Sequence, residues 1–465
     1  MVIVFALVAL LVLSALVAGN WFVWRRLFRD TTRGPGFVRR AGAVVIAGGW
    51  ALTVGALVAE RAGAPFLLQQ ILAWPGFLWL ALSIYLLLGV VAGELVRPLL
   101  RRWVERRARA EEAVREPEPV PAGVTAAASP AVSPATAPAT TSGTKAAENQ
   151  TLPSASGPST ALTTDPPPAS ETDPAPVLTP EPTDPSRPLA TPTRRLFVSR
   201  VVAGAAAAAA VGTVGYGTYG VLRGPKVKRV TVPLAKLPRA AHGYRIAVVS
   251  DIHLGPVLGR GFAQKVVDTI NGTQPDLIAV VGDLVDGSVK DLGPAAAPLA
   301  QLRARHGAFF VTGNHEYFSG AEQWVEEVRR LGLRPLENAR TELPHFDLAG
   351  VNDVAGEGEG QGPDFAKALG DRDRARACVL LAHQPVQIHD AVDHGVDLQL
   401  SGHTHGGQMW PGNLVAEMAN PTLAGLEHYG DTQLYVSRGA GAWGPPTRVG
   451  APSDVTVIEL ASRQA

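Results

Sequence analysis

Three long apolar segments separated by charged residues lie in the first part of the chain, at 1–24, 41–59 and 71–91. Each is close to the roughly 20 residues that a helix needs to cross the hydrocarbon core of a bilayer. A buried core helix is the alternative for all three, and a cleaved signal peptide for the first. A signal peptide carries its positive charge ahead of its apolar part, whereas here the arginines follow it. The pattern therefore predicts a membrane region with three transmembrane helices at 1–115.

A fourth apolar segment, at 201–221, is rich in Ala and Gly and follows Arg194 and Arg195. It fits a fourth transmembrane helix. It also fits a twin-arginine signal, in which paired arginines precede a weakly hydrophobic segment, and the twin-arginine export machinery would then be a partner. A helix lying on the lipid surface is a third alternative. In each case, residues 194–225 are predicted to attach the following residues to the membrane.

The arginines between the apolar segments predict an orientation. They crowd the loop at 25–40 and the stretch at 97–109, whereas the loop between the second and third segments carries only Arg61. Because cytoplasmic loops carry an excess of Lys and Arg, both arginine-rich stretches are expected in the cytoplasm. The fourth segment then crosses outward, which predicts a multi-pass cell-membrane protein with an extracytoplasmic C-terminal domain. Four basic residues argue against this orientation: Arg223, Lys226, Lys228 and Arg229.

Residues 116–193 have a different composition. They are mostly Pro, Ala, Thr and Ser, with few large apolar side chains. Such a segment cannot bury enough apolar surface to offset the entropy lost on ordering. We therefore expect a disordered linker between the membrane region and the fourth apolar segment.

Short apolar runs alternate with helical patterns over residues 226–465, which predicts an α/β domain. The predicted strands cover 245–250, 277–281, 308–312, 378–382 and 396–400, and the predicted helices cover 261–271, 299–305 and 321–331. Ligand sites in such domains lie at the carboxyl ends of the strands. Polar residues follow each of the predicted strands, so we expect their side chains to meet.

Seven of these polar residues offer oxygen or imidazole ligands and no sulfur: Asp251, His253, Asp283, Asn314, His383, His403 and His405. Such a mixture suits Mn, Fe, Zn or Ni better than Mg or Ca. Seven ligands are too many for one catalytic ion with an open position. They suit two divalent ions about 3.5–4 Å apart, with one carboxylate shared between them. The two carboxylates do not neutralise two such ions, so the site is expected to attract phosphate.

The polar blocks closely resemble, in order and spacing, the signature of the calcineurin-like metallophosphoesterase family. The blocks are Asp-x-His at 251–253, Gly-Asp-x-x-Asp-Gly at 282–287, Gly-Asn-His-Glu at 313–316, His383, and Gly-His-Thr-His at 402–405. The resemblance covers about 244–460. The segment at 437–446 is also similar to the membrane-tethered bacterial branch of the family. That branch includes exported members and relatives that act on lipid-linked or nucleotide-sugar diphosphates.

The resemblance implies a four-layer αββα sandwich, here preceded by all-α transmembrane helices. It also implies the role of each ligand. One ion would be held by Asp251, His253, Asp283 and His405, and the other by Asp283, Asn314, His383 and His403. Asp283 would then be the shared carboxylate. His315 would be the catalytic residue that gives a hydrogen bond or a proton to the phosphoryl or leaving oxygen.

Composition excludes some classes of protein. The net charge of +1 over 465 residues does not suggest a nucleic-acid partner. Cys378 is the only cysteine, so a disulfide within the chain is impossible. It lies in an apolar run and is expected to be buried. The three first segments contain no internal acidic residue, His or Lys, which argues against an ion path through them.

The sequence thus predicts a membrane-anchored, two-metal phosphoesterase that hydrolyses a phosphodiester, a phosphomonoester or a diphosphate. A lipid or a lipid-linked or nucleotide-sugar diphosphate is one possible substrate. The alternative is a non-catalytic, metal-dependent binding or scaffold module. Asp286 and Glu316 are expected to support the site rather than to bind metal. Trp410 and Trp443 fit three roles equally: lining a substrate groove, contacting lipid, or packing in the core.

Overall fold

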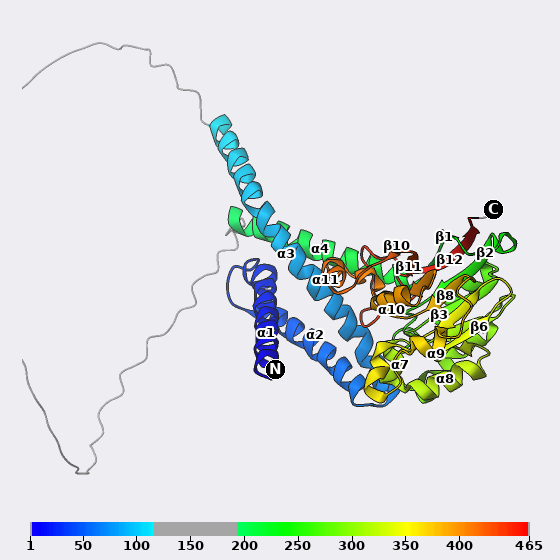
Figure 1. Cartoon of the computed structure of the whole chain (residues 1–465). Coiled ribbons are helices and arrows are strands. Elements are labelled where there is room, and N and C mark those ends of the chain that lie inside the picture. Colours follow the sequence, from blue (N-terminus) through cyan, green and yellow to red (C-terminus); the bar gives the residue numbers. More distant parts are fainter. Residues whose placement is uncertain (1, 116–192, 464–465) are drawn as a thin grey trace, which may run out of the picture. The chain divides into compact units, whose positions relative to one another are not determined.

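The computed structural model describes residues 2–115 and 193–463. The predicted disordered linker at 116–193 lies outside the described residues, apart from Thr193. Two six-stranded sheets and a set of long helices make up the described part of the chain (Figure 1).

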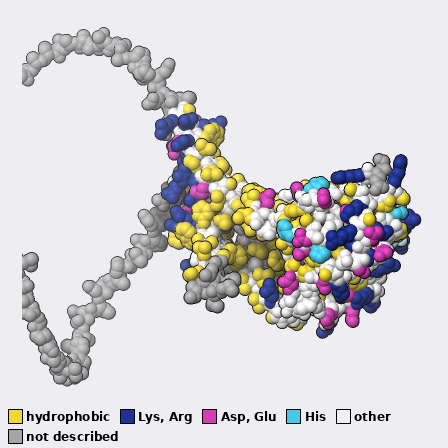
Figure 2. Space-filling model, in the orientation of Figure 1, with side chains coloured by type: hydrophobic (Ala, Val, Ile, Leu, Met, Phe, Trp, Pro, Cys, Tyr) yellow, Lys and Arg dark blue, Asp and Glu magenta, His cyan; other side chains and the backbone are white. Residues whose placement is uncertain are grey.

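Four helices in the described residues are long and apolar enough to cross a membrane. The first candidate span, Leu10–Arg29, overlaps α1 (Val2–Trp24), and the third, Phe66–Glu111, is most of α3 (Phe66–Arg115). The other two are α2 (Phe37–Arg61) and α4 (Arg194–Leu222). Figure 2 shows hydrophobic side chains along much of the elongated part of the molecule, with Lys and Arg at its upper end, whereas charged side chains are scattered over the rounded part. The structure thus supports the predicted transmembrane helices. Helix α3 continues well beyond the predicted apolar segment, because Arg, Glu and Ala in its second half favour helix.

Charged residues meet at one end of the apolar helices. Arg26 follows α1, and its guanidinium pairs with Asp30 at 2.7 Å and with Glu94 of α3 at 2.6 Å. Arg97 pairs with Glu94 at 3.2 Å. Because an unpaired charge is costly in hydrocarbon, this cluster marks where the apolar part of α3 ends.

The first sheet has the strand order β1-β12-β2-β3-β4-β5, and the second has the order β10-β11-β9-β8-β7-β6. The first contains β1 (Lys226–Leu234), β2 (Tyr244–Val249), β3 (Leu277–Val281), β4 (Ala308–Val311), β5 (Arg334–Pro335) and β12 (Asp454–Ser462). The second contains β6 (Ala339–Glu342), β7 (Asp347–Gly350), β8 (Cys378–Leu381), β9 (Leu398–Ser401), β10 (Gly425–Tyr429) and β11 (Thr432–Val436). All five predicted strands are present.

The side chains of β2 show how the layers form. Ile246 and Val248 pack in the core between the two sheets, whereas Ala247 and Val249 pack under the helices on the other face. This is the two-residue alternation of a strand that is buried on both faces. The arrangement of helices, sheet, sheet and helices confirms the predicted four-layer fold. Cys378 is fully buried in β8, as predicted.

Helices cover the outer faces of both sheets. They are α5 (Arg260–Gly272), α6 (Val289–Ala296) and α8 (Ala321–Arg330) on the first sheet, and α9 (Phe365–Leu369) and α10 (Ile388–Asp393) on the second. Two further helices lie near the polar blocks. Helix α7 (Asn314–Ser319) carries most of the block after β4, and α11 (Gly412–Ala419) follows the block after β9. The predicted helix at 299–305 is wrong in position. The helix begins at Val289, where the Ser288 side chain accepts a hydrogen bond from the Asp291 N–H and caps it.

Candidate metal centre

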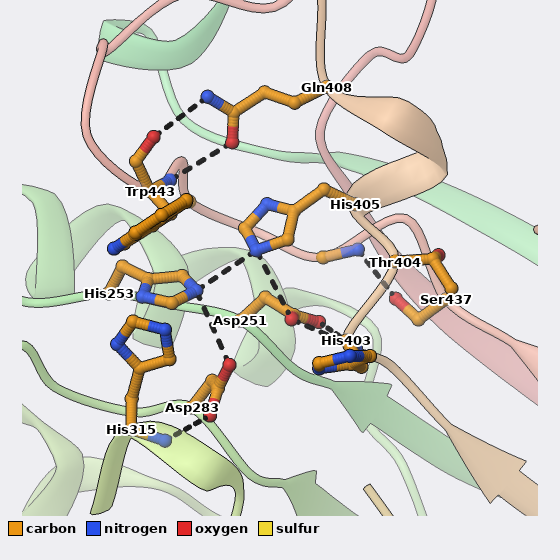
Figure 3. Close-up of polar contacts among 12 residues, drawn as sticks. Asp251, His253, Asp283, His315, His403, Thr404, His405, Gln408, Ser437 and Trp443 are labelled. Carbon is orange, nitrogen blue, oxygen red and sulfur yellow. Dashed lines mark hydrogen bonds and ion pairs between the residues drawn. The ribbon is translucent and has the colours of Figure 1, made fainter. Parts of the chain in front are cut away.

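The first group of predicted ligands, Asp251, His253 and His405, meets beyond the carboxyl end of β2. His405 Nε2 lies 3.0 Å from His253 Nε2 and 3.3 Å from Asp251 Oδ1. All three side chains are buried. Their ligand atoms lie within 4.8 Å of one another, which is close enough to share one ion (Figure 3).

The second group contains Asp283, His383 and His403, whose ligand atoms also lie within 4.8 Å of one another. Asn314 belongs with it, because its Oδ1 lies 2.9 Å from His403 Nδ1. Asp283 Oδ2 lies 3.2 Å from His383 Nε2 and 3.7 Å from His253 Nε2. This carboxylate therefore faces both groups, as a shared ligand must. The structure thus brings all seven predicted ligands together.

The backbone is strained at many of these positions. Eight non-glycine residues in the described part of the chain have a positive φ. Five of the eight are predicted ligands: Asp251, His253, Asp283, His403 and His405. Each such residue costs of order 1–3 kcal/mol, and such residues cluster where a function requires them. With positive φ values, side chains that are close together in a short loop can point toward the same site.

Two glycines allow the strand ends to approach one another. A Cβ atom at Gly402 would collide with the Asp251 side chain, and one at Gly313 would collide with Asp283. Any other residue at either position would displace a predicted ligand. These two positions of the sequence blocks are therefore occupied by glycine for a steric reason.

The Glu316 side chain stabilises the loops that carry Asp283 and Gly313. Its buried carboxylate accepts hydrogen bonds from the backbone N–H groups of Asp283 at 3.0 Å, Leu284 at 2.8 Å and Gly313 at 2.6 Å. Burial and the nearby Asp283 carboxylate raise the pKa of Glu316 to about 7. The contacts fix two loops against each other and agree with the supporting role expected from the sequence.

Replacing Glu316 with Gln is expected to lower the free energy of unfolding by about 1–3 kcal/mol, because an amide nitrogen then faces backbone donors in a buried site. Thermal unfolding of the full-length protein in detergent measures the change. The matched control is Glu337→Gln, which removes only an exposed pair with Arg329 and should cost less than about 1 kcal/mol. Equal losses in the two variants would contradict the role given to Glu316.

Asp286 joins His253 of the first group to His315. Its Oδ1 lies 2.7 Å from His315 Nδ1 and 2.9 Å from His253 Nδ1. The backbone N–H of His315 also donates to Asp283 Oδ1 at 2.9 Å. Burial opposes ionisation of Asp286, but the charge and the hydrogen bond of His253 and the hydrogen bond of His315 outweigh it and lower its pKa to about 2. The Asp286 carboxylate is therefore ionised and orients His315. Its oxygen also lies within 4.8 Å of ligand atoms of His253 and His315, so the supporting role expected from the sequence stays a prediction.

The imidazoles differ in protonation. Burial and the charge of His383 lower the pKa of His403 to about 4, so His403 is neutral at pH 7, as a metal ligand must be. Burial also opposes the charge on His253, but Asp286 outweighs it and raises the pKa of His253 to about 9. A cation bound at His253 would therefore displace a proton.

The donor set fits a metal ion. His383 Nδ1 lies 2.9 Å from the carbonyl oxygen of Val281. Because a carbonyl can only accept, Nδ1 carries a hydrogen, which leaves Nε2 as the atom that a cation would bind in place of a proton. Nε2 is buried and has no hydrogen-bond partner, although it faces Asp283. An orphaned buried nitrogen aimed at a carboxylate is what a ligand of a bound cation leaves behind.

Two exposed aromatic side chains flank His315. The ring centroid of Trp443 lies 5.7 Å and that of Phe318 lies 5.6 Å from the His315 ring. Trp443 is held by Gln408, whose Nε2 donates to the Trp443 carbonyl and whose Oε1 accepts from the Trp443 N–H (Figure 3). Trp443 and Trp410 are 53% and 51% exposed, so the core-packing interpretation is wrong for both.

Sequence reasoning missed three residues at this site. Glu60 at the end of α2 and Phe77 of α3 line a small cavity together with His253, Asp286 and Trp443. No local pattern links residues so far apart in the chain.

The third is Arg448, whose buried guanidinium donates to the carbonyls of Gly441, His405 and Ala451. It fixes the turn that carries His405. A single arginine in a loop is not a sequence pattern that predicts this role.

Comparison with known proteins agrees with this geometry. The profile of the calcineurin-like phosphoesterase family matches residues 244–407, which contain all seven predicted ligands and His315. The chain is 39% identical over 247 residues to a metallophosphoesterase of Helicobacter pylori, which covers 52% of this chain and 66% of that protein. It is 37% identical over 259 residues to a transmembrane protein with a metallophosphoesterase domain from Danio rerio, over 53% of this chain and 59% of that protein.

These two relatives are thus matched over less than two thirds of their length. A metallophosphoesterase of Aquifex aeolicus is matched over 91% of its length, with 34% identity over 240 residues and 50% of this chain. The chain therefore belongs to the calcineurin-like phosphoesterase family.

Proposed function

We propose that the chain is a membrane-anchored phosphoesterase with two metal ions. The observation that carries the proposal is the position of Asp283, which faces His383 on one side and His253 on the other. Asp251, His253, Asp283 and His405 would hold one ion, and Asp283, Asn314, His383 and His403 the other. Bound divalent cations would supply Lewis-acid binding of the phosphoryl oxygens and an activated water.

His315 would give a proton to the leaving oxygen. Its Nδ1 is engaged by Asp286, which leaves Nε2 free to face the substrate. The contact with Asp286 also fixes the orientation of the His315 imidazole, so this side chain needs little reorganisation during the reaction. A non-catalytic binding module would not need a charged pair at this position, which argues against that alternative.

The substrate is proposed to be a phosphodiester, phosphomonoester or diphosphate, and a lipid or lipid-linked molecule fits best. The exposed rings of Trp443 and Phe318 beside His315 give an apolar rim that suits such a substrate. We further propose that the sheet domain is extracytoplasmic, carried there by α4 either as a plain transmembrane helix or through the twin-arginine machinery. The arginines at 25–40 and 97–109 support this orientation.

Removal of metal by a chelator is expected to abolish hydrolysis of bis-p-nitrophenyl phosphate by the full-length protein in detergent, and Mn is expected to restore it. Release of p-nitrophenol measures the rate. The control is Mn alone without protein. Substituting His428, an exposed histidine far from the polar blocks in sequence, with Ala should leave the rate unchanged. If protein shown to be metal-free hydrolyses the ester at the same rate with and without added metal, the proposal is wrong.

A further inference from the structure

An exposed apolar surface lies a few residues beyond His405. It consists of Trp410 and three side chains of α11, Leu414, Val415 and Met418, and is called the α11 surface below. Their exposed fractions are 51%, 55%, 71% and 89%. Exposed bulky apolar side chains gathered in this way mark an interaction site rather than a surface in contact with water.

The α11 surface continues from the long apolar helices. The Tyr85 hydroxyl of α3 donates to the carbonyl oxygen of Trp410 at 2.9 Å. Met409 packs against the apolar cluster formed by Tyr85 and Ala81 of α3 and Val214 of α4.

The contact with Tyr85 sets the depth of this surface. The charged cluster of Arg26, Glu94 and Arg97 marks one end of the apolar part of α3. Tyr85 precedes Glu94 by nine residues in the chain. That is about 13 Å along a helix with a rise of 1.5 Å per residue, and a bilayer has a hydrocarbon core about 30 Å thick. Tyr85 therefore lies within the apolar stretch of α3, and Trp410, which bonds to it, lies at the same level.

The composition of the segment fits lipid. Between His405 and His428, the only charged residues are Glu417 and Glu427, and there is no Lys or Arg. A helix with apolar side chains on its outer face can lie with those side chains among the acyl chains of a leaflet.

We propose that the α11 surface inserts into the lipid leaflet next to α3 and thereby holds the mouth of the metal centre against the bilayer. The occupant is lipid, not a protein. The inference rests on the transmembrane helices and does not require the chain to be a hydrolase.

The test uses the full-length protein in nanodiscs of phosphatidylcholine and phosphatidylglycerol. Cys378 is fully buried, so a thiol-reactive fluorophore labels only an introduced cysteine. Met418→Cys places the label on the α11 surface, and Val415→Cys is a second position on it. Glu342→Cys, exposed on β6 at the far edge of the second sheet, is the matched control. The quencher is phosphatidylcholine that carries a nitroxide on its acyl chain.

We expect the nitroxide lipid to quench labels at 418 and 415 several-fold more than the label at 342, and aqueous iodide to show the reverse order. Strong quenching by iodide at 418 would overturn the proposal. Protection from both quenchers would also overturn it, because a second copy or another protein would then cover the surface. Neither outcome depends on turnover, so the result is separate from the test of the phosphoesterase function.

Discussion

Replacing Asp283 with Asn is expected to lower kcat for bis-p-nitrophenyl phosphate by more than about 10³-fold. Changing a group that only orients a metal ligand typically costs about 10–100-fold in affinity or activity. Asp283 faces both groups of predicted ligands, so its loss should exceed that range. The metal content of the purified protein, measured by mass spectrometry, should fall together with the rate.

The matched control for this experiment is Asp268→Asn. Asp268 is an exposed aspartate of α5 whose side chain accepts a hydrogen bond only from Gln264 of the same helix. It should keep the rate and metal content of the unchanged protein. If Asp283→Asn keeps both as well, the shared-ligand assignment is wrong, whatever the other ligands do.

Replacing His315 with Ala is expected to lower kcat by about 10²–10⁴-fold, the usual contribution of a positioned acid. His315 faces the site from the edge and bonds to Asp286 through its side chain, so metal content should stay unchanged. The loss should depend on the leaving group. It should be larger for a phenyl ester, whose leaving oxygen needs a proton, than for a p-nitrophenyl ester.

This dependence separates proton donation from simple positioning. An equal loss for both esters would show that His315 only orients the substrate. A loss of metal in His315→Ala would instead make it a ligand. His428→Ala serves again as the control, because it removes an exposed imidazole outside the polar blocks.

The strands and the clustering of the predicted metal ligands could be predicted because their signals are local. The apolar run ending at Val249 predicts a buried strand, and Asp251 and His253 follow it within four residues. Alternation of strands and helices predicts that such polar ends meet. The supporting role of Asp286 was expected, but not its simultaneous contact with His253 and His315.

The length of α3 and the start of α6 were harder to predict. Polar residues can extend a helix without any apolar period, as they do from Arg97 to Arg115. The helix that begins at Val289 depends on the cap at Ser288, which is a weaker signal than an apolar pattern.

The sequence by itself thus determined which residues are candidates for the chemistry, because ligand type and strand position are encoded in short stretches of chain. Only the tertiary structure decided which of them face each other, that Trp443 stands beside His315, and that Glu60 and Phe77 reach the same cavity. The contact between Tyr85 and Trp410 was likewise decided only there. The physical reason is that such contacts join residues far apart in the chain, and no periodicity of either partner encodes the pairing.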